Sequence, residues 1–177
     1  DYSRTVHPTR QALEANLAAL EGAKFGLCFA SGMAATSTVI EMLEPGDHVV
    51  SCNDLYGGIY RAFTKVFERF GIKFSFVNAT DLKAVEAAMT PKTKLLWIET
   101  PSNPMLQITD IKKVCALARA KGVKVAVDNT FATPVLQRPL DLGADLIVHS
   151  TTKYLGGHSD VVGGCVVTSD EEIYHKL

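Results

Sequence analysis

The sequence has no cysteine pair with the spacing of a metal or redox site, and no excess of either charge. Its cysteines stand singly in apolar segments, so we predict neither a zinc site nor a disulfide framework, but small core thiols in a reducing compartment. The four are Cys28, Cys52, Cys115 and Cys165. The formal net charge of -1 over 177 residues gives no electrostatic reason to expect nucleic acid or an anionic membrane as a partner.

No pair of histidines suggests a metal site. We expect the following histidines to be structural or solvated: His48, His149 and His175. Long hydrophobic runs are also absent. Charged or turn residues interrupt every apolar stretch well before the roughly 20 residues that a membrane-spanning helix needs, and no basic-then-apolar leader opens the sequence. These absences predict a soluble, cytoplasmic protein.

Apolar and β-branched runs alternate with segments of helical period. The predicted strands are 26–30, 47–52, 73–77, 94–98, 123–127, 145–149 and 163–168. Most of them are nearly continuous hydrophobic runs, as in strands that are buried on both faces. The predicted helices are 9–21, 33–43, 58–70, 81–89 and 110–121. This alternation predicts an α/β layered fold with a largely parallel sheet.

Two of the helical segments carry more detailed predictions. The 58–70 helix is expected to bury one stripe made of Tyr60, Phe63, Phe67 and Phe70. Thr80 is a plausible N-cap for the 81–89 helix.

The two ends of the sequence suggest part of a longer polypeptide. It opens with Asp1 rather than Met, and it stops at Leu177 inside a predicted helix. A possible capping box of Ser169 and Glu172 begins that helix.

Polar and small residues follow five of the predicted strands, where open α/β sheets bind their ligands. Gly32 and Met33 come after the first strand and offer free backbone N–H groups at a helix start, which suits a phosphate. Asp128 ends a strongly apolar strand, where a carboxylate is costly unless it faces a cation or several donors. Tyr56 lies between turn residues and can lay its ring against a flat ligand.

Lys153 stands among hydroxyls and glycines in the stretch "HSTTKYLGGHSD". Taken alone it is a solvated loop lysine, whereas burial beside the apolar strand would make its amine a nucleophile. An amine, a carboxylate, a stacking ring and a phosphate cradle together meet the needs of pyridoxal phosphate. Taken singly, each has an ordinary alternative: Asp128 as a helix cap, Tyr56 as a core residue, Ser150 and Thr152 as loop residues. A nucleotide site ranks lower, because neither G-x-x-x-x-G-K-[ST] nor a G-x-G-x-x-G after a strand occurs.

At these residues the sequence resembles the trans-sulfuration (Cys/Met metabolism) family of pyridoxal-phosphate enzymes. The matching segments are "YSRT-x-x-PTR", "SGMAAT", "DLYGG", "ETPSNP", "VDNTF" and "HSTTKYLGGHSDVVGG", from Tyr2 to about Val167. The resemblance implies the aspartate-aminotransferase-like, type I fold, a three-layer sandwich with a mostly parallel seven-stranded sheet. Residues 1–177 would form its cofactor-binding large domain. The N-terminal arm and the C-terminal domain, with the arginine that grips the substrate carboxylate, would lie outside this sequence.

The resemblance also implies roles for single residues. Lys153 would form the Schiff base and shuttle protons, Asp128 would keep the pyridine nitrogen protonated, and Tyr56 would stack on the ring. Thr130 would lie near the other face of the ring and Asn103 near its hydroxyl side. The implied phosphate ligands are Gly32, Met33, Ser150 and Thr152.

Tyr2 and Arg4 match residues that reach the phosphate of a neighbouring subunit, which implies a homotetramer built from dimers that share active sites. Val6 and His7 depart from the usual Gly-Asn of that opening motif. Gly58 stands where methionine γ-lyases typically carry a cysteine, which argues against that branch.

The expected reaction is γ-elimination on a small amino acid, cleaving L-cystathionine to cysteine, 2-oxobutanoate and ammonia. Two alternatives stay open. One is cystathionine γ-synthase, which replaces the γ-substituent of an O-acyl homoserine by cysteine, and the other is a non-catalytic cofactor-binding fragment.

Overall fold

A computed structural model describes residues 2–177. Seven strands form one sheet in the order β1-β7-β6-β5-β4-β2-β3. Their bounds are β1 Phe25–Phe29, β2 His48–Cys52, β3 Lys73–Val77, β4 Thr93–Glu99, β5 Lys124–Asp128, β6 Leu146–His149 and β7 Gly164–Thr168. Every predicted strand is confirmed, with its ends placed to within one residue.

The sheet is mostly parallel, and β7 alone among these strands runs against the others. β3, β2, β4, β5 and β6 pair in parallel. β7 is antiparallel both to β6 and to β1, so two reversals bring β1 back to the direction of β6. The carboxyl ends of all strands except β7 therefore lie at one edge, as the sequence argument requires.

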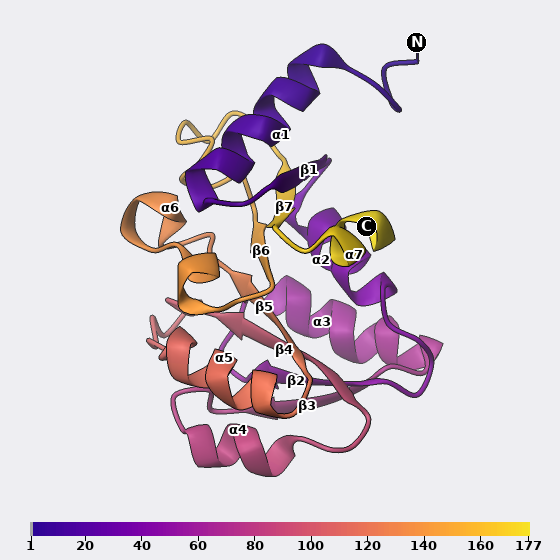
Figure 1. Ribbon diagram of the computed structural model, residues 1–177, viewed down its shortest axis with the longest axis vertical. Coiled ribbons are helices and arrows are strands. Elements are labelled where there is room, and N and C mark those ends of the chain that lie inside the picture. Colours follow the sequence, from indigo (N-terminus) through magenta and orange to yellow (C-terminus); the bar gives the residue numbers. More distant parts are fainter. Residues whose placement is uncertain (1) are drawn as a thin grey trace.

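Helices cover both faces of the sheet. They are α1 Pro8–Glu21, α2 Gly32–Glu41, α3 Gly57–Lys65, α4 Leu82–Ala88, α5 Ile111–Ala120, α6 Thr133–Leu136 and α7 Glu171–Lys176, with 3-10 turns η1 Phe67–Phe70 and η2 Pro139–Leu142. α2 and α3 lie on one face and α4 and α5 on the other, while α1 packs on β1 and β7 (Figure 1). The result is the predicted three-layer sandwich. Within residues 2–177, no helix combines the length and apolar character needed to cross a bilayer.

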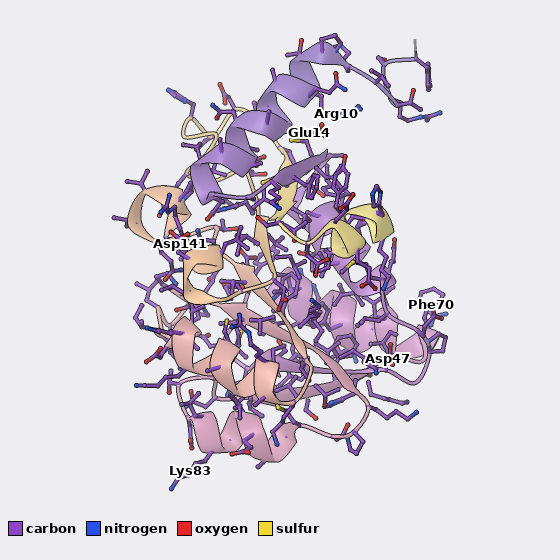
Figure 2. The ribbon with its side chains drawn as sticks, in the orientation of Figure 1. Arg10, Glu14, Asp47, Phe70, Lys83 and Asp141 are labelled. Carbon is purple, nitrogen blue, oxygen red and sulfur yellow. The ribbon has the colours of Figure 1, made fainter. Side chains whose placement is uncertain are left out.

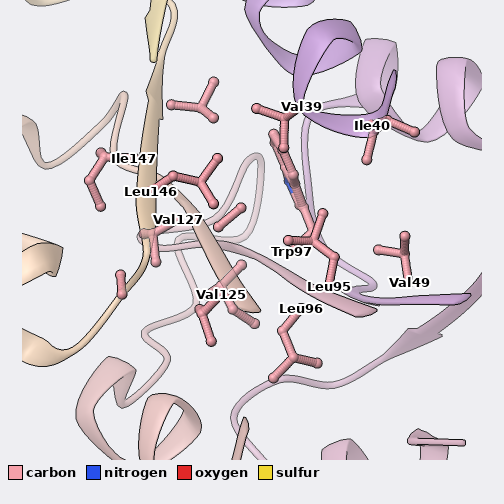
Figure 3. Close-up of a cluster of buried hydrophobic side chains, with 14 of the residues drawn as sticks. Val39, Ile40, Val49, Leu95, Leu96, Trp97, Val125, Val127, Leu146 and Ile147 are labelled. Atoms are coloured by element: carbon pink, nitrogen blue, oxygen red, sulfur yellow. The ribbon is translucent and has the colours of Figure 1, made fainter. Parts of the chain in front are cut away.

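The core lies on both sides of the central strands. Along β4, Leu95 and Trp97 point toward Val39 of α2, whereas Leu96 points to the opposite layer (Figure 3). All four side chains are at most 2% exposed. Successive residues of a strand face opposite ways, so a strand covered on both faces needs apolar residues at every position. This explains why the strands read as continuous hydrophobic runs.

The predicted 58–70 helix was wrong in its second half. α3 ends at Lys65, and Val66, at φ -113° and ψ -65°, breaks the helix before the η1 turn. Phe63 and Phe67 are buried, as predicted, but Phe70 is 66% exposed. Figure 2 shows Phe70 projecting from the edge of the molecule. Tyr60 is also largely exposed.

The predicted caps of two helices were each one residue too early. Asp81 and Asp170 cap α4 and α7, in place of Thr80 and Ser169. In both cases the aspartate Oδ1 accepts the N–H groups two and three positions further on. A carboxylate does this well because the positive end of the helix dipole favours negative charge.

Candidate functional site

A pocket of about 260 Å³ opens at the edge of the sheet where the parallel strands end. Its lining comes from the segments that follow β1, β2, β4, β5 and β6, so the fold brings these five strand ends together. The predicted site residues that line it are Gly32, Met33, Tyr56, Asn103, Asp128, Thr130, Ser150, Thr152 and Lys153. Other lining residues, such as Ile59 and Val162, carry no polar signal that the sequence could have revealed.

The start of α2 forms an anion-binding wall of this pocket. Ser31 caps the helix by accepting the N–H of Ala34 at 3.0 Å. The first N–H groups of a helix have no acceptor inside it, so those of Gly32 and Met33 remain available to a ligand. A Cβ at position 32 would lie 2.7 Å from Cβ of Ser150. Only glycine therefore lets this wall approach Ser150 so closely.

Asp128 is the buried carboxylate of the pocket, only 8% exposed. Thr130 donates to its Oδ1 twice, from the backbone N–H at 3.0 Å and from the hydroxyl at 2.5 Å. These bonds favour the ionised form, but burial outweighs them and raises the pKa of the Asp128 carboxyl. Such a group gains most from a cationic partner placed in the pocket.

Glu99 is a second carboxyl in the same pocket, and the sequence reasoning gave it no role. It ends β4 directly beside Asp128 on β5, and it is 6% exposed. Burial, and then the neighbouring Asp128 charge, raise the pKa of Glu99 to about 8. The signal that could have found it is the one that marked Asp128, an acid at the end of an apolar strand.

Tyr56 is tied to Glu99 through its backbone. The Tyr56 N–H donates to Glu99 Oε2 at 2.9 Å. The Tyr56 ring lies over Gly58, where an added Cβ would fall 2.3 Å from Cε1 of the ring. The side chain is 46% exposed, so the ring forms part of the pocket wall and not of the core. The Tyr56 ring can lie there only because residue 58 is a glycine, which has no side chain.

Lys153 lines the pocket but is an exposed residue. Of the two alternatives, its exposure fits the loop lysine and not the buried one. A tight turn carries the lysine: its N–H donates to Ser150 O at 3.2 Å, and its carbonyl accepts the N–H of Gly157 at 2.8 Å. This turn begins directly after β6 ends at His149, and it places Lys153 at the exposed mouth of the pocket.

The Thr152 hydroxyl forms two hydrogen bonds with the backbone of Gly163. Its Oγ1 donates to the carbonyl of Gly163 at 3.2 Å and accepts the Gly163 N–H at 3.0 Å. This pair closes the loop between β6 and β7 and keeps Thr152 at the pocket wall. On the opposite side, Asp54 holds the loop that carries Asn103, by accepting from the Ser102 hydroxyl and from the backbone N–H of Met105.

Tyr2 and Arg4 do not line this pocket. They lie in an exposed turn before α1, with the Arg4 guanidinium 5.0 Å from the centre of the Tyr2 ring. Arg10 holds the turn by donating to the carbonyls of Ser3, Arg4 and Thr5 at 2.9 to 3.1 Å. Figure 2 shows Arg10 and Glu14 together on α1 near the N-terminus.

The sandwich, with a lysine, a buried acid, an aromatic ring and an anion-binding helix start at one sheet edge, defines a pyridoxal-phosphate-dependent fold of the aspartate-aminotransferase type. Comparison with known proteins gives the same class and a family. The chain belongs to the Cys/Met metabolism PLP-dependent enzymes, whose family model matches residues 1–177.

Curated relatives within this family carry different activities. The chain is 56% identical over 174 residues to a cystathionine γ-synthase of Mycobacterium tuberculosis. The match covers 98% of this chain and 45% of that protein. The chain is 52% identical over 177 residues to a cystathionine γ-lyase of Bacillus subtilis, covering 100% of the chain and 47% of that protein. The chain thus spans about half the length of the curated relatives it matches.

A solved structure has the same backbone fold over nearly the whole chain. The crystal structure of cystathionine γ-lyase from Lactobacillus plantarum complexed with L-serine superposes with a TM-score of 0.98 at 50% sequence identity. The match covers 99% of this chain and 46% of that chain.

Proposed function

We propose that residues 1–177 form the cofactor-binding large domain of an enzyme that cleaves L-cystathionine by γ-elimination to cysteine, 2-oxobutanoate and ammonia. The observation that carries the proposal is the meeting of Lys153, Asp128 and Tyr56 with the α2 start in one pocket. Membership of a family described by its pyridoxal-phosphate dependence supports the same conclusion.

The residues of the pocket fit pyridoxal phosphate. When bound, the cofactor supplies an aldehyde for a lysine amine and a pyridine ring that withdraws electrons. Lys153 Nζ would hold the aldehyde carbon, and the Asp128 carboxylate would accept the N–H of the ring. A cationic ring nitrogen would offset the cost of burying Asp128, which the two bonds from Thr130 compensate only in part. The N–H groups of Gly32 and Met33, with the Ser150 hydroxyl, would receive the phosphate.

The same residues would carry out the proton transfers. With its amine free, Lys153 Nζ would take the proton from the α-carbon of the substrate. Once it had passed that proton on, the same amine could take a second proton from the β-carbon. The exposed position of Lys153 at the mouth leaves its side chain free to move between these carbons. Tyr56 lies on the pocket wall, where its ring would stack on the cofactor and its phenol would serve as a second proton carrier. Asn103 would orient the hydroxyl side of the ring, with Thr130 near the other face.

A second candidate is cystathionine γ-synthase, which joins an O-acyl homoserine to cysteine. The relative with 56% identity bears this name, so the candidate has support of its own. Both reactions use a γ-carbon leaving group and the same pocket residues, and both act on a small amino acid.

The assembly in the proposal is a homotetramer made of dimers that share active sites. Within the described residues, the pocket lining contains a single cationic side chain, Lys153, which the cofactor aldehyde would occupy. A phosphate therefore lacks a counter-charge there. Tyr2 and Arg4 are exposed and would supply it to a neighbouring subunit. The four cysteines are free thiols, which supports a reducing, cytoplasmic location.

The test uses the full-length gene product loaded with pyridoxal phosphate. We expect a visible absorption band that borohydride abolishes while fixing the cofactor to Lys153, and release of 2-oxobutanoate from cystathionine. Lys153→Ala should lose both, whereas Lys83→Ala, an exposed lysine of α4 labelled in Figure 2, should lose neither. Synthesis of cystathionine from an O-acyl homoserine without cleavage would establish the second candidate. A bound cofactor with neither reaction would leave a non-catalytic domain, and a reducible band in Lys153→Ala would disprove the lysine assignment.

A further inference from the structure

A buried carboxylate that the proposed function does not use lies behind the pocket. Glu21 is the last residue of α1 and is 1% exposed. Burying a carboxylate costs several kcal/mol unless its partners compensate, and a negative charge at the carboxyl end of a helix opposes the helix dipole. Neither burial nor the dipole favours an acid here. One carboxyl oxygen, Oε1, has hydrogen-bond partners, whereas Oε2 is buried without a partner among the described residues.

Glu21 bridges two neighbouring strand ends through one oxygen. Its Oε1 accepts from Asn129 Nδ2 at 2.7 Å and lies 2.6 Å from Nε2 of His149. Asn129 is 0% exposed and His149 is 1% exposed, so His149 is structural, as expected, and not solvated. Glu21 precedes these partners by 108 and 128 positions. The bridge is therefore a product of the tertiary fold alone.

Each partner of Glu21 is adjacent in sequence to residues that line the pocket. Asn129 stands between Asp128 and Thr130, and His149 directly precedes Ser150. Successive side chains of extended chain point to opposite sides. Asn129 and His149 therefore point back into the protein while their neighbours face the pocket.

The same two segments are also joined on the pocket side. Thr130 Oγ1 donates to Asp128 and accepts the N–H of Ser150 at 2.9 Å. The 128–130 and 149–152 segments are thus cross-linked twice, by Thr130 in front and by Glu21 behind.

A third strand end is tied to the same network. Asn129 Nδ2 also donates to the carbonyl of Gln137 at 2.9 Å, and Gln137 Nε2 donates to Asn129 Oδ1 at 2.9 Å. Gln137 Nε2 donates in addition to the carbonyl of Thr100 at 2.9 Å, directly after Glu99. With its amide held on both sides, Asn129 has one orientation, and Glu21 is the acceptor that joins this amide to His149.

We propose that Glu21 is a positioning residue of the cofactor pocket, which holds the 128–130 and 149–152 segments at the separation that the cofactor requires. It touches neither cofactor nor substrate and acts through Asn129 and His149. The inference rests on the proposed function, since it takes pyridoxal phosphate as the ligand of this pocket.

Three variants of the full-length gene product test it, with pyridoxal phosphate as the probe. Glu21→Leu removes the acceptor at similar size, and Glu21→Gln keeps an acceptor oxygen. Val85→Ala is the matched control, because Val85 is 0% exposed in the core at α4, away from the pocket lining. The measurements are the cofactor Kd, the induced circular dichroism of the bound cofactor, and the thermal midpoint.

For Glu21→Leu we expect a Kd raised about tenfold, the usual effect of losing a residue behind the direct ligands, and weaker induced dichroism. Glu21→Gln should stay close to the wild type. Val85→Ala should lower the midpoint with the Kd unchanged. If Glu21→Leu lowers only the midpoint, as Val85→Ala does, the proposal is overturned.

Should Glu21→Leu not fold, His149→Leu replaces it. His149 Nε2 bonds to Glu21 and its other ring nitrogen has no partner among the described residues, so this variant removes one of the two bonds to Glu21 and no other. It should raise the Kd about fivefold, the worth of one hydrogen bond; an unchanged Kd would equally overturn the proposal. A wild type that binds no pyridoxal phosphate would instead contradict the proposed function, and the two failures are thereby distinguished.

Discussion

The hydroxyl of Thr130 lies 2.5 Å from Oδ1 of Asp128 and donates its hydrogen to that oxygen. The same hydroxyl accepts the backbone N–H of Ser150. One side chain therefore holds both the Asp128 carboxyl and the start of the segment that carries Ser150 and Thr152. A threonine suits this position, since a hydroxyl can donate and accept at once.

Replacing this hydroxyl should disturb both partners together. Thr130→Val keeps the shape of the side chain but leaves the Ser150 N–H without its acceptor and Asp128 with one donor fewer. We expect the free energy of unfolding to fall by about 1–3 kcal/mol, measured by urea unfolding of the cofactor-free protein. Thr130→Ser, which retains the hydroxyl, should remain much closer to the wild type. Equal stability of the Val and Ser variants would show that these bonds contribute little.

The Glu99 carboxyl should make stability depend on pH. Its pKa is raised from 4.5 to about 8, chiefly by burial and then by Asp128. The folded protein therefore holds a proton that the unfolded chain releases, so the stability contributed by neutral Glu99 is present below about pH 4.5. It is lost as the pH rises toward about 8. Glu99→Gln keeps an acceptor for Tyr56 and cannot ionise.

The measurement for Glu99 is the free energy of unfolding of the wild type minus that of Glu99→Gln, followed from pH 4.5 to 9. Taking the difference cancels the titrating groups that lie far from Glu99. We expect the wild type to lose stability relative to the variant across this range and the difference to level off above about pH 8. A flat difference would mean that Glu99 ionises normally in the folded protein.

Gly58 should control where the ring of Tyr56 lies. A Cβ at position 58 would overlap the ring, whereas a Cβ at the adjacent Gly57 would meet only Arg61 Nη1 at 3.9 Å. Gly58→Ala should therefore displace the ring and weaken cofactor binding about tenfold, near the upper end of what an aromatic contact contributes. Gly57→Ala, the matched control, lies in the same helix start and should leave binding unchanged. Equal Kd values for the two variants would show that the ring adapts without loss.

Arg10 should matter only through the turn that it holds. His7 makes no side-chain cap at the start of α1. Residues 3–5 are held by the three carbonyl contacts of Arg10, together with the bonds of the turn itself to the Tyr2 carbonyl. If Arg4 binds a phosphate in a neighbouring subunit, Arg10→Ala should weaken cofactor binding by about fivefold, the worth of one hydrogen bond. It should have no further effect once Arg4 is replaced by alanine.

The readout for Arg10 is the cofactor Kd of the wild type, both single variants and the double variant. Non-additivity is expected, because the two residues belong to one chain of contacts. Full additivity would show that Arg10 acts independently of Arg4, and Arg69→Ala on the η1 turn serves as a surface control.

The sequence predicted the strands well because each one carries its own signal. Strands such as β4 are covered on both faces, so every position is apolar and the run can be recognised without its neighbours. Helix ends were less predictable. Whether Thr80 or Asp81 caps α4 depends on which side chain reaches the free N–H groups, and the two residues are equally suited by type.

Residues that line the pocket were predicted where a strand end carried a recognisable residue type, as with Asp128, Lys153 and Tyr56. Glu99 is likewise an acid at the end of an apolar strand, and the sequence argument gave it no role. Its raised pKa depends in part on lying beside Asp128 in the sheet register, which the sequence does not reveal. The sequence left the exposure of Lys153 open, since its burial depends on the turn that carries it and not on its neighbours in sequence.

By itself, the order of residues determined the alternation of strands and helices, the parallel sheet and the set of strand ends that carry chemistry. Only the tertiary structure decided which of those groups touch, which carboxyl shares its burial with another, and that Glu21 joins Asn129 to His149 behind the pocket. The physical reason is range. Periodicity and turn chemistry act over a few residues, whereas desolvation and hydrogen bonding depend on atoms that the fold brings together from positions more than a hundred residues apart.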